Sequence, residues 1–349
     1  MKFVLDDFDY DLPPELIAQT PAPQRGQSRM MVLERRKQTL EHAQFSDIVR
    51  YFSHGDALVL NDTKVRAARL FGLIGERSAE VLLVERIAQN RYLIKGRPGR
   101  KMRPGTELVF PAAGLRARIV DSEAPLPDGM KKLQFEGERD VEELLDAVGA
   151  MPLPPYIKRP STAEDAQRYQ TVYARKPGAI AAPTAGLHFS PALLSQLEQR
   201  QVRLIYVTLH IGIGTFAAVK ETDITRHTMH EESYEVSAEA AQAIETVKRR
   251  GGKICAVGTT SCRVLESCAG VDAGDFRIRP GAGKTRIFMY PPYAFKAVDM
   301  LLTNFHLPRT TLLMLVHAFG GHDFLKRAYA EAVSRRYRFF SYGDCMLIT

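Results

Sequence analysis

The sequence predicts an α/β core, with a mainly parallel sheet covered by helices and a small antiparallel β-barrel inserted into it. Two patterns support this fold class. Residues 191–319 alternate between apolar strands and helices, which is typical of a parallel sheet. Residues 61–151 instead carry short strand-like runs separated by Gly and Pro, which is typical of a barrel or sandwich. We therefore expect residues 1–60 and 152–349 to form the core domain, and residues 61–151 to form the barrel domain.

The composition is that of a soluble globular protein. The 349 residues are 45% hydrophobic and 25% charged, and no apolar run is long enough to span a bilayer. An excess of 48 basic over 40 acidic residues favours a polyanionic partner. The four cysteines form no C-x-x-C pair, which supports neither a zinc site nor a redox motif. Unpaired thiols indicate a cytoplasmic protein, and we expect a monomer that binds no membrane.

The first part of the core reads as a strand at residues 30–33, a short helix at 47–52 and an apolar strand at 56–60. The last strand ends in the polar sequence Asn61-Asp62-Thr63-Lys64. Asp62 and Lys64 could simply belong to a turn with a solvated lysine. A role of these two residues in a functional site is equally open.

The insert follows from Val65. Alternation of apolar and polar residues predicts strands at 66–74, 79–87, 91–96, 106–110, 115–121 and 131–136, with a helix at 140–148. Basic side chains crowd together in the third of these strands and directly after it: Arg91, Lys95, Arg97, Arg100, Lys101 and Arg103. They are either a solvated, charged edge or a surface that faces nucleic acid.

The second part of the core begins with a Pro-rich return segment at 151–159, and a helix is expected at 165–174. Ser190-Pro191 starts a helix that runs to residue 200, with Ser as the N-cap and Pro at the first helical position. Further strands are predicted at 202–209, 234–236, 253–257, 297–302 and 340–348. Further helices are predicted at 238–250, after Ser261 as far as Ala269, and at 312–319.

Polar segments follow several of the predicted strands, at 61–64, 210–216, 258–261 and 303–308. Ligands of open α/β sheets bind beyond the carboxyl ends of the strands, so these segments could share one crevice. The sequence contains no Walker motif, and Gly212-Ile213-Gly214 lacks the third glycine of a dinucleotide fingerprint. A Walker ATPase and a standard dinucleotide-binding protein are therefore both disfavoured.

The loop at residues 178–190 is small, nearly uncharged and rich in Gly and Ala. It brings Thr184 and His188 to the start of a helix, where free N–H groups can bind a ligand. A tight buried connection would need the same small residues, so binding and packing both remain open.

Four histidines, His188, His210, His230 and His306, lie beside loops of the core. A histidine in a loop is more often structural, but these positions could include a catalytic base or acid. Their spacing does not match a metal site. Thr259, Thr260 and Ser261 either cap a helix or bind ribose or carboxylate oxygens.

Motifs along essentially the whole chain resemble one family, the S-adenosylmethionine:tRNA ribosyltransferase-isomerases of queuosine biosynthesis (the QueA family). The matching segments are 7–13, 61–65, 152–158, 183–189, 210–216, 258–261, 303–308 and 340–348. Two departures are visible. Pro292 stands where the family has Gly in a Tyr-Pro-Gly-Tyr turn, and Cys345 stands where it has Ala. Neither removes a polar group.

The resemblance implies that S-adenosylmethionine is a co-substrate that donates its ribosyl part. That part is transferred to 7-aminomethyl-7-deazaguanine at the wobble position of a tRNA and rearranged, which gives epoxyqueuosine and releases adenine and methionine. No metal is expected. The family fold is an α/β domain with an inserted antiparallel barrel, in agreement with the boundaries above.

The reaction needs a base beside the sulfonium, a donor to the leaving adenine and a deprotonated substrate amine. We expect proton transfer by His188 or His210, with Asp62 and Glu231 in reserve. The expected cofactor-binding residues are Thr184, Gly186, Gly212, Gly214, Thr215, Thr259, Thr260 and Ser261. The expected contacts with the RNA substrate are Lys64, Tyr156, Lys158, Arg159, Asn304 and His306. The alternatives are an S-adenosylmethionine-dependent tRNA methyltransferase and a non-catalytic RNA-binding protein.

Overall fold

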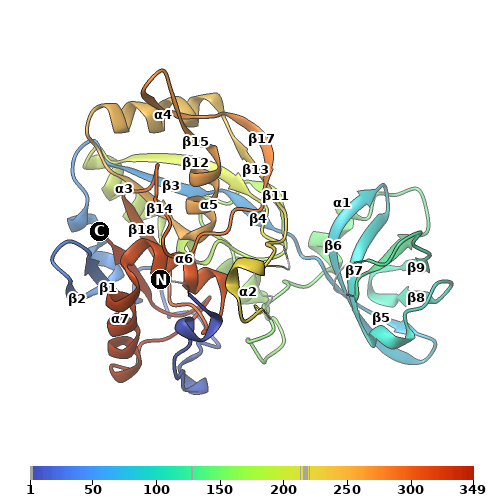
Figure 1. The fold of residues 1–349 in the computed structure, drawn as a ribbon. Coiled ribbons are helices and arrows are strands. Elements are labelled where there is room, and N and C mark those ends of the chain that lie inside the picture. The colour runs from blue at the N-terminus through green and yellow to red at the C-terminus, as the bar shows by residue number, and fades with distance from the viewer. Residues whose placement is uncertain (1–2, 127–128, 213, 215–218, 220) are drawn as a thin grey trace. The chain divides into compact units, whose positions relative to one another are not determined.

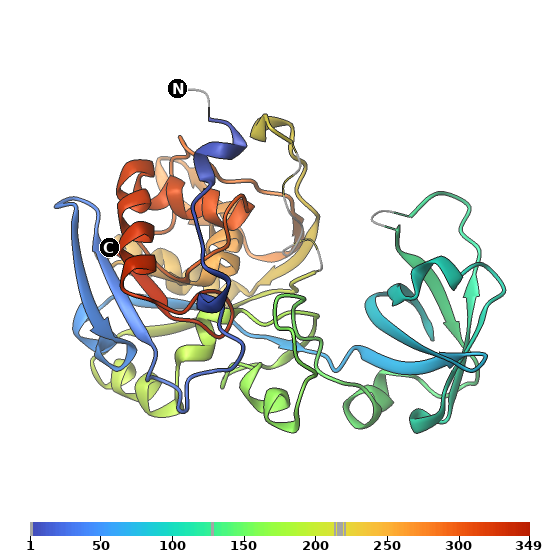
Figure 2. The same cartoon turned by 90° about the horizontal axis from the view of Figure 1, so that it is seen from below.

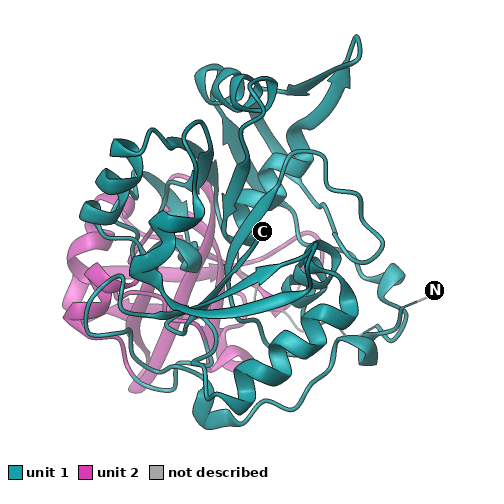
Figure 3. Ribbon diagram, turned by 90° about the vertical axis from the view of Figure 1, so that its left-hand side faces the viewer, with its two compact units in different colours: residues 1–64, 155–159, 170–349 teal, residues 65–154, 160–169 magenta. Residues whose placement is uncertain are grey.

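The computed structural model describes residues 3–126, 129–212, 214, 219 and 221–349. The chain divides into two compact units, coloured separately in Figure 3. The first comprises Met1–Lys64, Pro155–Arg159 and Gln170–Thr349, and the second comprises Val65–Pro154 and Pro160–Tyr169. The first unit contains the α/β sheet and the second contains a closed barrel, which confirms the predicted fold class.

The core sheet has nine strands in the order β17-β13-β12-β3-β14-β18-β19-β1-β2 (Figure 1). Strands β12, β3, β14 and β18 are parallel neighbours in its centre, and β19 pairs parallel with β1. The remaining pairs are antiparallel, so the sheet as a whole is mixed. The strand bounds are β1 Arg29–Glu34, β2 Thr39–Gln44, β3 Ala57–Asn61, β12 Arg203–Leu209, β13 Glu232–Val236, β14 Ile254–Val257, β17 Gly281–Thr285, β18 Met300–Asn304 and β19 Cys345–Ile348.

Both faces of the central strands are covered, which explains why these strands read as continuous apolar runs. Along β3, Ala57 and Val59 pack into one hydrophobic cluster, while Leu58 and Leu60 pack into the other. Apolar residues of α4, α5, α6 and α7 fill the first cluster, and those of η3 and α3 fill the second. The bounds are η3 Phe45–Tyr51, α3 Pro191–Gln199, α4 Ala238–Arg249, α5 Gly258–Cys268, α6 Thr311–Gly320 and α7 His322–Ser334.

Shorter elements complete the first unit: η1 Leu5–Phe8, η2 Pro14–Leu16, β4 Thr63–Val65, β11 Lys176–Ala179, η7 Thr184–His188, η9 Ile224–Arg226, β15 Ala269–Asp272 and β16 Asp275–Ile278. Element η7 lies within the small, uncharged loop at residues 178–190. In chain order it stands between β11 and helix α3, both labelled in Figure 1, and Figure 2 shows the same ribbon turned by 90°.

The second unit is a closed barrel of six antiparallel strands in the order β10-β7-β6-β5-β8-β9. Its interior holds large buried rings, among them Tyr92, Phe110 and Phe135. All six strands match predicted segments. The bounds are β5 Arg69–Ile74, β6 Arg77–Ala88, β7 Arg91–Arg97, η4 Gly99–Lys101, β8 Glu107–Phe110, η5 Pro111–Ala113, β9 Leu115–Val120, β10 Lys131–Phe135, α1 Glu142–Val148 and α2 Ala163–Arg168.

The predicted helix at 165–174 is wrong in its extent. Helix α2 begins earlier, because the Thr162 backbone N–H and hydroxyl both donate to Asp165 and cap it. It ends at Arg168, and the buried Tyr169 and Tyr173 lie outside it. The predicted strand at 340–348 is also shorter, because Phe340 has a left-handed φ of 72° that breaks extended structure.

Candidate active site

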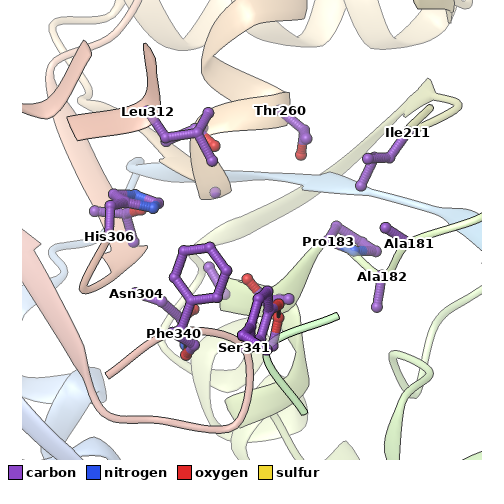
Figure 4. Close-up of a pocket in the computed structure, with 16 residues that line it drawn as sticks. Ala181, Ala182, Pro183, Ile211, Thr260, Asn304, His306, Leu312, Phe340 and Ser341 are labelled. Carbon is purple, nitrogen blue, oxygen red and sulfur yellow. Dashed lines mark hydrogen bonds between the residues drawn. The ribbon is translucent and has the colours of Figure 1, made fainter. Parts of the chain in front are cut away.

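A cavity opens at the carboxyl ends of β14 and β18, the edge where the sequence predicts a shared crevice (Figure 4). About 530 Å³ of space free of protein atoms surrounds it, a volume that includes open solvent. Three of the predicted polar segments contribute to it, while 61–64 does not. The lining residues are Tyr156, Ala181, Ala182, Pro183, Thr184, Ala185, Ile211, Gly258, Thr259, Thr260, Thr303, Asn304, His306, Leu312, Phe340 and Ser341.

The turn from β14 into α5 places two threonines in the cavity wall. Gly258 adopts a φ of 89°, which side chains rarely tolerate, so the strand can turn directly into the helix. Thr259 and Thr260 follow in the first turn of α5. The Thr260 hydroxyl is buried and has no hydrogen-bond partner among the described residues. A ligand in the cavity can supply the partner that this hydroxyl lacks.

The end of β18 supplies a second polar wall. The Thr303 hydroxyl and His306 Nε2 are 2.8 Å apart, and burial lowers the pKa of His306 to about 3. His306 is therefore neutral near pH 7. The Asn304 side-chain amide donates to the Phe340 carbonyl at 2.9 Å, which fixes Asn304 Oδ1 as the acceptor end. That buried oxygen makes no hydrogen bond of normal geometry.

The aromatic rings of Phe340 and Tyr156 form the opposite wall. Figure 4 shows Phe340 and Ser341 on one side of the cavity, with Leu312 and Thr260 on the other. The Phe340 and Tyr156 ring centroids are 4.1 Å apart and nearly perpendicular. The Tyr156 hydroxyl also hydrogen-bonds the Ser341 hydroxyl. These contacts hold the segment that carries the positive φ at Phe340.

The cavity wall is uncharged among the residues that the structure describes. It contains no Asp, Glu, Lys or Arg side chain, and its one histidine is neutral. The same described part of the chain contains no cluster of three metal-ligating side chains. The wall thus combines flat apolar surface with isolated hydroxyl, amide and imidazole groups. Such a wall is suited to a planar heterocycle and, through the aromatic faces, to a single soft cation.

His188 is buried and is not among the residues that line the cavity. Its Nδ1 is 2.9 Å from the Ser28 hydroxyl. Burial lowers the pKa of His188 to about 4, the Asn304 side chain opposes that shift, and the charges of Arg25 and Arg338 add to it. His188 is therefore neutral near pH 7. Its second ring nitrogen, Nε2, makes no hydrogen bond of normal geometry with the described residues, although the Asn304 side chain influences its pKa.

His210 and Asp62 lie together at the neighbouring ends of β12 and β3. His210 Nδ1 is 2.8 Å from the Thr63 hydroxyl. Asp62 is buried, accepts a 2.7 Å hydrogen bond from Thr208 and lies 3.3 Å from the Arg175 guanidinium. Neither side chain lines the cavity.

Glu231 is exposed and forms ion pairs with Lys284 and Arg286, which hold the pKa of its carboxyl below the usual value. The adjacent Glu232, which has no predicted role, is buried and forms an ion pair with Arg263 of α5. Glu232 also accepts a hydrogen bond from the Gly212 backbone at 3.3 Å. The buried carboxylate thereby links the loop after β12 to α5.

Other predicted site residues lie near the cavity or outside the described residues. A Cβ on Gly186 would lie 2.1 Å from the Tyr173 hydroxyl, so this glycine allows η7 to pack closely. Gly214 packs in the same way against His230, and Ser261 donates to the Val257 carbonyl. Thr215 lies outside the described residues.

Three of the residues predicted to contact RNA lie away from the cavity lining. Lys158 is exposed, Arg159 is half-buried and donates to the Gln19 carbonyl, and Lys64 is half-buried. The other three, Tyr156, Asn304 and His306, line the cavity itself.

Sequence reasoning missed three members of the wall: Phe340, Ser341 and Leu312. Ile211 and Thr303 lie in segments that were predicted to share the crevice, although no role was predicted for either residue. Phe340 and Ser341 lie in a segment predicted as a strand. Asp344 of the same segment accepts hydrogen bonds from the backbone of Arg29 and Arg338. No helix within the described ranges is both long and apolar enough to span a membrane.

Comparisons with known proteins agree along the full chain. A family profile described as "Queuosine biosynthesis protein" matches residues 5–348. S-adenosylmethionine:tRNA ribosyltransferase-isomerases from Pelotomaculum thermopropionicum and Symbiobacterium thermophilum are 52% and 51% identical, with 99% of each chain covered. A crystal structure of S-adenosylmethionine tRNA ribosyltransferase from Thermotoga maritima matches with a TM-score of 0.56 and 40% identity, over 98% of this chain and 100% of that one. The chain therefore belongs to the queuosine biosynthesis protein family of S-adenosylmethionine:tRNA ribosyltransferase-isomerases.

Proposed function

We propose that this protein transfers the ribosyl part of S-adenosylmethionine to 7-aminomethyl-7-deazaguanine at the wobble position of a tRNA and isomerises it. The products are epoxyqueuosine in the tRNA, free adenine and methionine. The observation that carries the proposal is the full-length match to enzymes of this activity at about half sequence identity. We place the protein in the cytoplasm and expect it to act as a monomer without a metal.

The uncharged cavity is our candidate for the S-adenosylmethionine site. Apolar surface from Ala181, Pro183 and Leu312 suits a flat adenine ring. The faces of Phe340 and Tyr156 suit the sulfonium, since aromatic rings attract cations without a carboxylate. A carboxylate close to the sulfonium would stabilise the bound S-adenosylmethionine before it reacts. Ribosyl transfer removes the positive charge of the sulfonium, so this stabilisation would be lost during the reaction. A neutral wall therefore favours the reaction over tight binding of the substrate.

The polar groups of the cavity have distinct proposed roles. The buried Thr260 hydroxyl and Asn304 Oδ1 are oriented groups that lack ordinary protein partners. Asn304 Oδ1 can accept only, so we assign it to an N–H or O–H group of the bound co-substrate. Thr184, Thr259 and Thr260 are proposed to contact the ribose or the adenine. His306, held by Thr303, can donate or accept one hydrogen bond as a neutral ring.

Of the two histidines first considered for proton transfer, His210 has the surroundings that support this role better. His188 is fully enclosed, and a pKa near 4 makes it a weak base. We propose that His188 positions Asn304, and through it the Phe340 carbonyl. His210 is half-buried and its Nδ1 is oriented by Thr63, as a base is oriented by a neighbouring group. Asp62 and Glu231 remain reserve candidates, both already engaged with basic partners.

Release of adenine tests the proposed function directly. The protein is incubated with S-adenosylmethionine and a tRNA that carries the deazaguanine precursor, and the small products are separated. We expect adenine and methionine in equal amounts with the modified tRNA. S-adenosylhomocysteine in their place would identify a methyltransferase. Retention of tRNA with no small product would identify a non-catalytic RNA-binding protein.

A further inference from the structure

The outer face of the barrel places an exposed aromatic ring beside unpaired basic side chains. Phe71 on β5 pairs with Glu80 on β6, and Glu80 pairs with Arg97 on β7. Directly paired residues point to the same side of a sheet, so these three side chains share one row of the outer face. The next row contains Arg69, Leu82 and Lys95. Phe71 is 58% exposed and is the one aromatic residue among the exposed large hydrophobic side chains of the described residues.

The acidic residue in this region is already neutralised. Glu80 accepts a 2.7 Å hydrogen bond from the Arg69 guanidinium, which itself also donates to the Leu153 carbonyl. The neighbouring basic side chains form no ion pair with any described residue, and all are exposed: Lys95, Arg97, Arg100, Lys101 and Arg103. Residues 91–106 contain no acidic residue at all. The positive charge of this face is therefore uncompensated by any ion pair among the described residues of the barrel.

A rigid turn keeps the second half of this charge next to the first. Met102 is buried and packs directly under Gly96, where a Cβ would lie only 2.1 Å from its sulfur. The Thr106 hydroxyl donates to the Lys101 carbonyl at 3.1 Å and accepts from the Arg103 backbone at 3.2 Å. Element η4 is thus held against β7, and its basic residues Arg100 and Lys101 are exposed next to that strand in the chain.

We infer that this basic–aromatic face, formed by Phe71, Lys95, Arg97, Arg100, Lys101 and Arg103, binds the tRNA. The basic side chains contact backbone phosphates, and the Phe71 ring stacks on an unpaired base. Aromatic rings next to cationic side chains on a β-surface are the usual means of binding single-stranded nucleic acid. A solvated edge would explain the charge but gives no reason to expose Phe71. The inference rests on the proposed function, because that function makes tRNA the macromolecular substrate.

Two sets of variants separate the charge from the ring. The test variant is the double substitution Lys95→Gln/Arg97→Gln. The control is Arg86→Gln/Arg118→Gln, which changes the net charge by the same amount but at arginines that form ion pairs with Asp140 and Glu107. The dissociation constant for tRNA is measured at several salt concentrations. We expect the first double variant to bind more weakly and to lower the slope of log K against log salt by about 0.7 to 0.9 per lost contact. The control pair should keep the wild-type slope.

The ring is tested with Phe71→Ala, Phe71→Leu and Phe71→Tyr on two RNAs, an anticodon stem-loop and a hairpin without unpaired bases. Stacking predicts that Phe71→Ala weakens stem-loop binding by roughly fivefold or more, that Leu does not rescue and that Tyr does. The hairpin should be unaffected. Since Phe71 is exposed, the thermal midpoint should not change.

Wild-type tRNA affinity in both Lys95→Gln/Arg97→Gln and Phe71→Ala would overturn the inference. An equal loss for the Arg86→Gln/Arg118→Gln control would also overturn it, because net charge alone would then explain binding. These affinities do not depend on turnover. If the wild-type protein releases no adenine, the proposed function fails while the binding series still decides whether this face holds RNA.

Discussion

Asn304 connects the interior of the core to the wall of the cavity. Its amide nitrogen donates to the Phe340 carbonyl, and its side chain interacts with the buried His188, which in turn contacts Ser28. Phe340 holds a left-handed φ, a conformation that costs about 1–3 kcal/mol and persists only where surrounding contacts impose it. At the scale of single residues, these contacts explain why His188 is buried and neutral although it does not line the cavity.

The pair His188 and Asn304 should therefore act as a unit. We expect His188→Ala and Asn304→Ala each to raise the KM for S-adenosylmethionine, with a double variant little worse than either single variant, because both release the Phe340 carbonyl. His188→Asn should keep turnover within about tenfold of wild type, with the same pH profile between pH 6 and 9. Steady-state kinetics over this range provide the measurement.

His210→Ala serves as the comparison. Loss of a proton-transfer group lowers kcat by roughly a hundred- to ten-thousand-fold. If His188→Asn shows that loss with unchanged affinity, while His210→Ala is unaffected, the roles proposed for the two histidines are reversed. Wild-type turnover in both alanine variants would remove both residues from the mechanism.

Element η7 brings Thr184 to the cavity through close packing that only glycine allows. A methyl group on Gly186 would collide with the Tyr173 hydroxyl and the Thr171 side chain, so Gly186→Ala must displace the element. We expect it to lower the affinity for S-adenosylmethionine and to destabilise the core by about 1–3 kcal/mol. The matched control is Gly270→Ala, where the added methyl group meets no neighbour. Calorimetric titration and thermal unfolding of both variants test this, and equal behaviour would contradict it.

At the scale of elements, the sequence predicted those strands and helices that local sequence patterns specify. Alternation identified all six barrel strands, and the Ser190-Pro191 cap identified the start of α3. Helix α7 was not predicted. It follows Gly321 directly, without a side-chain cap. The Gly-rich strand β17 lacks apolar alternation and is held by pairing with β13.

The candidate site was predicted only where it follows a strand. The cavity residues Thr259 and Thr260 follow β14, and Asn304 and His306 lie at or just after the end of β18. Ligands of open α/β sheets bind beyond the carboxyl ends of the strands, so the place of these four residues at the cavity could be predicted. Phe340 reaches the cavity through a backbone conformation that sequence does not encode for a phenylalanine. The roles of His188 and Glu232 depend on long-range contacts with Asn304 and Arg263, which a one-dimensional pattern cannot show.

At the scale of the whole molecule, several buried histidines make stability depend on pH. Burial lowers the pKa of His188 to about 4, and that of His306 and His317 to about 3. Unfolding returns each to about 6.5. Between pH 6.5 and 4 the unfolded chain therefore binds more protons than the folded one, and stability falls as the pH is lowered.

We expect the thermal midpoint of the core to decrease by roughly 5–10 °C from pH 7 to pH 5, since each histidine contributes up to about 2 kcal/mol. His317→Gln should weaken this dependence. Scanning calorimetry at both pH values provides the measurement. A midpoint that is the same at pH 7 and pH 5 would show that these histidines are protonated in the folded state.

The fate of the ribosyl carbons tests the central claim most directly. S-adenosylmethionine is prepared with ¹³C either in its ribose or in its methyl group, and each form is incubated with the protein and precursor-bearing tRNA. Mass spectrometry of the nucleosides then locates the label. We predict that the ribose label enters the tRNA as adenine is released, and that the methyl label leaves with methionine. Methyl label in the tRNA, or ribose label that stays with adenine, would contradict the account.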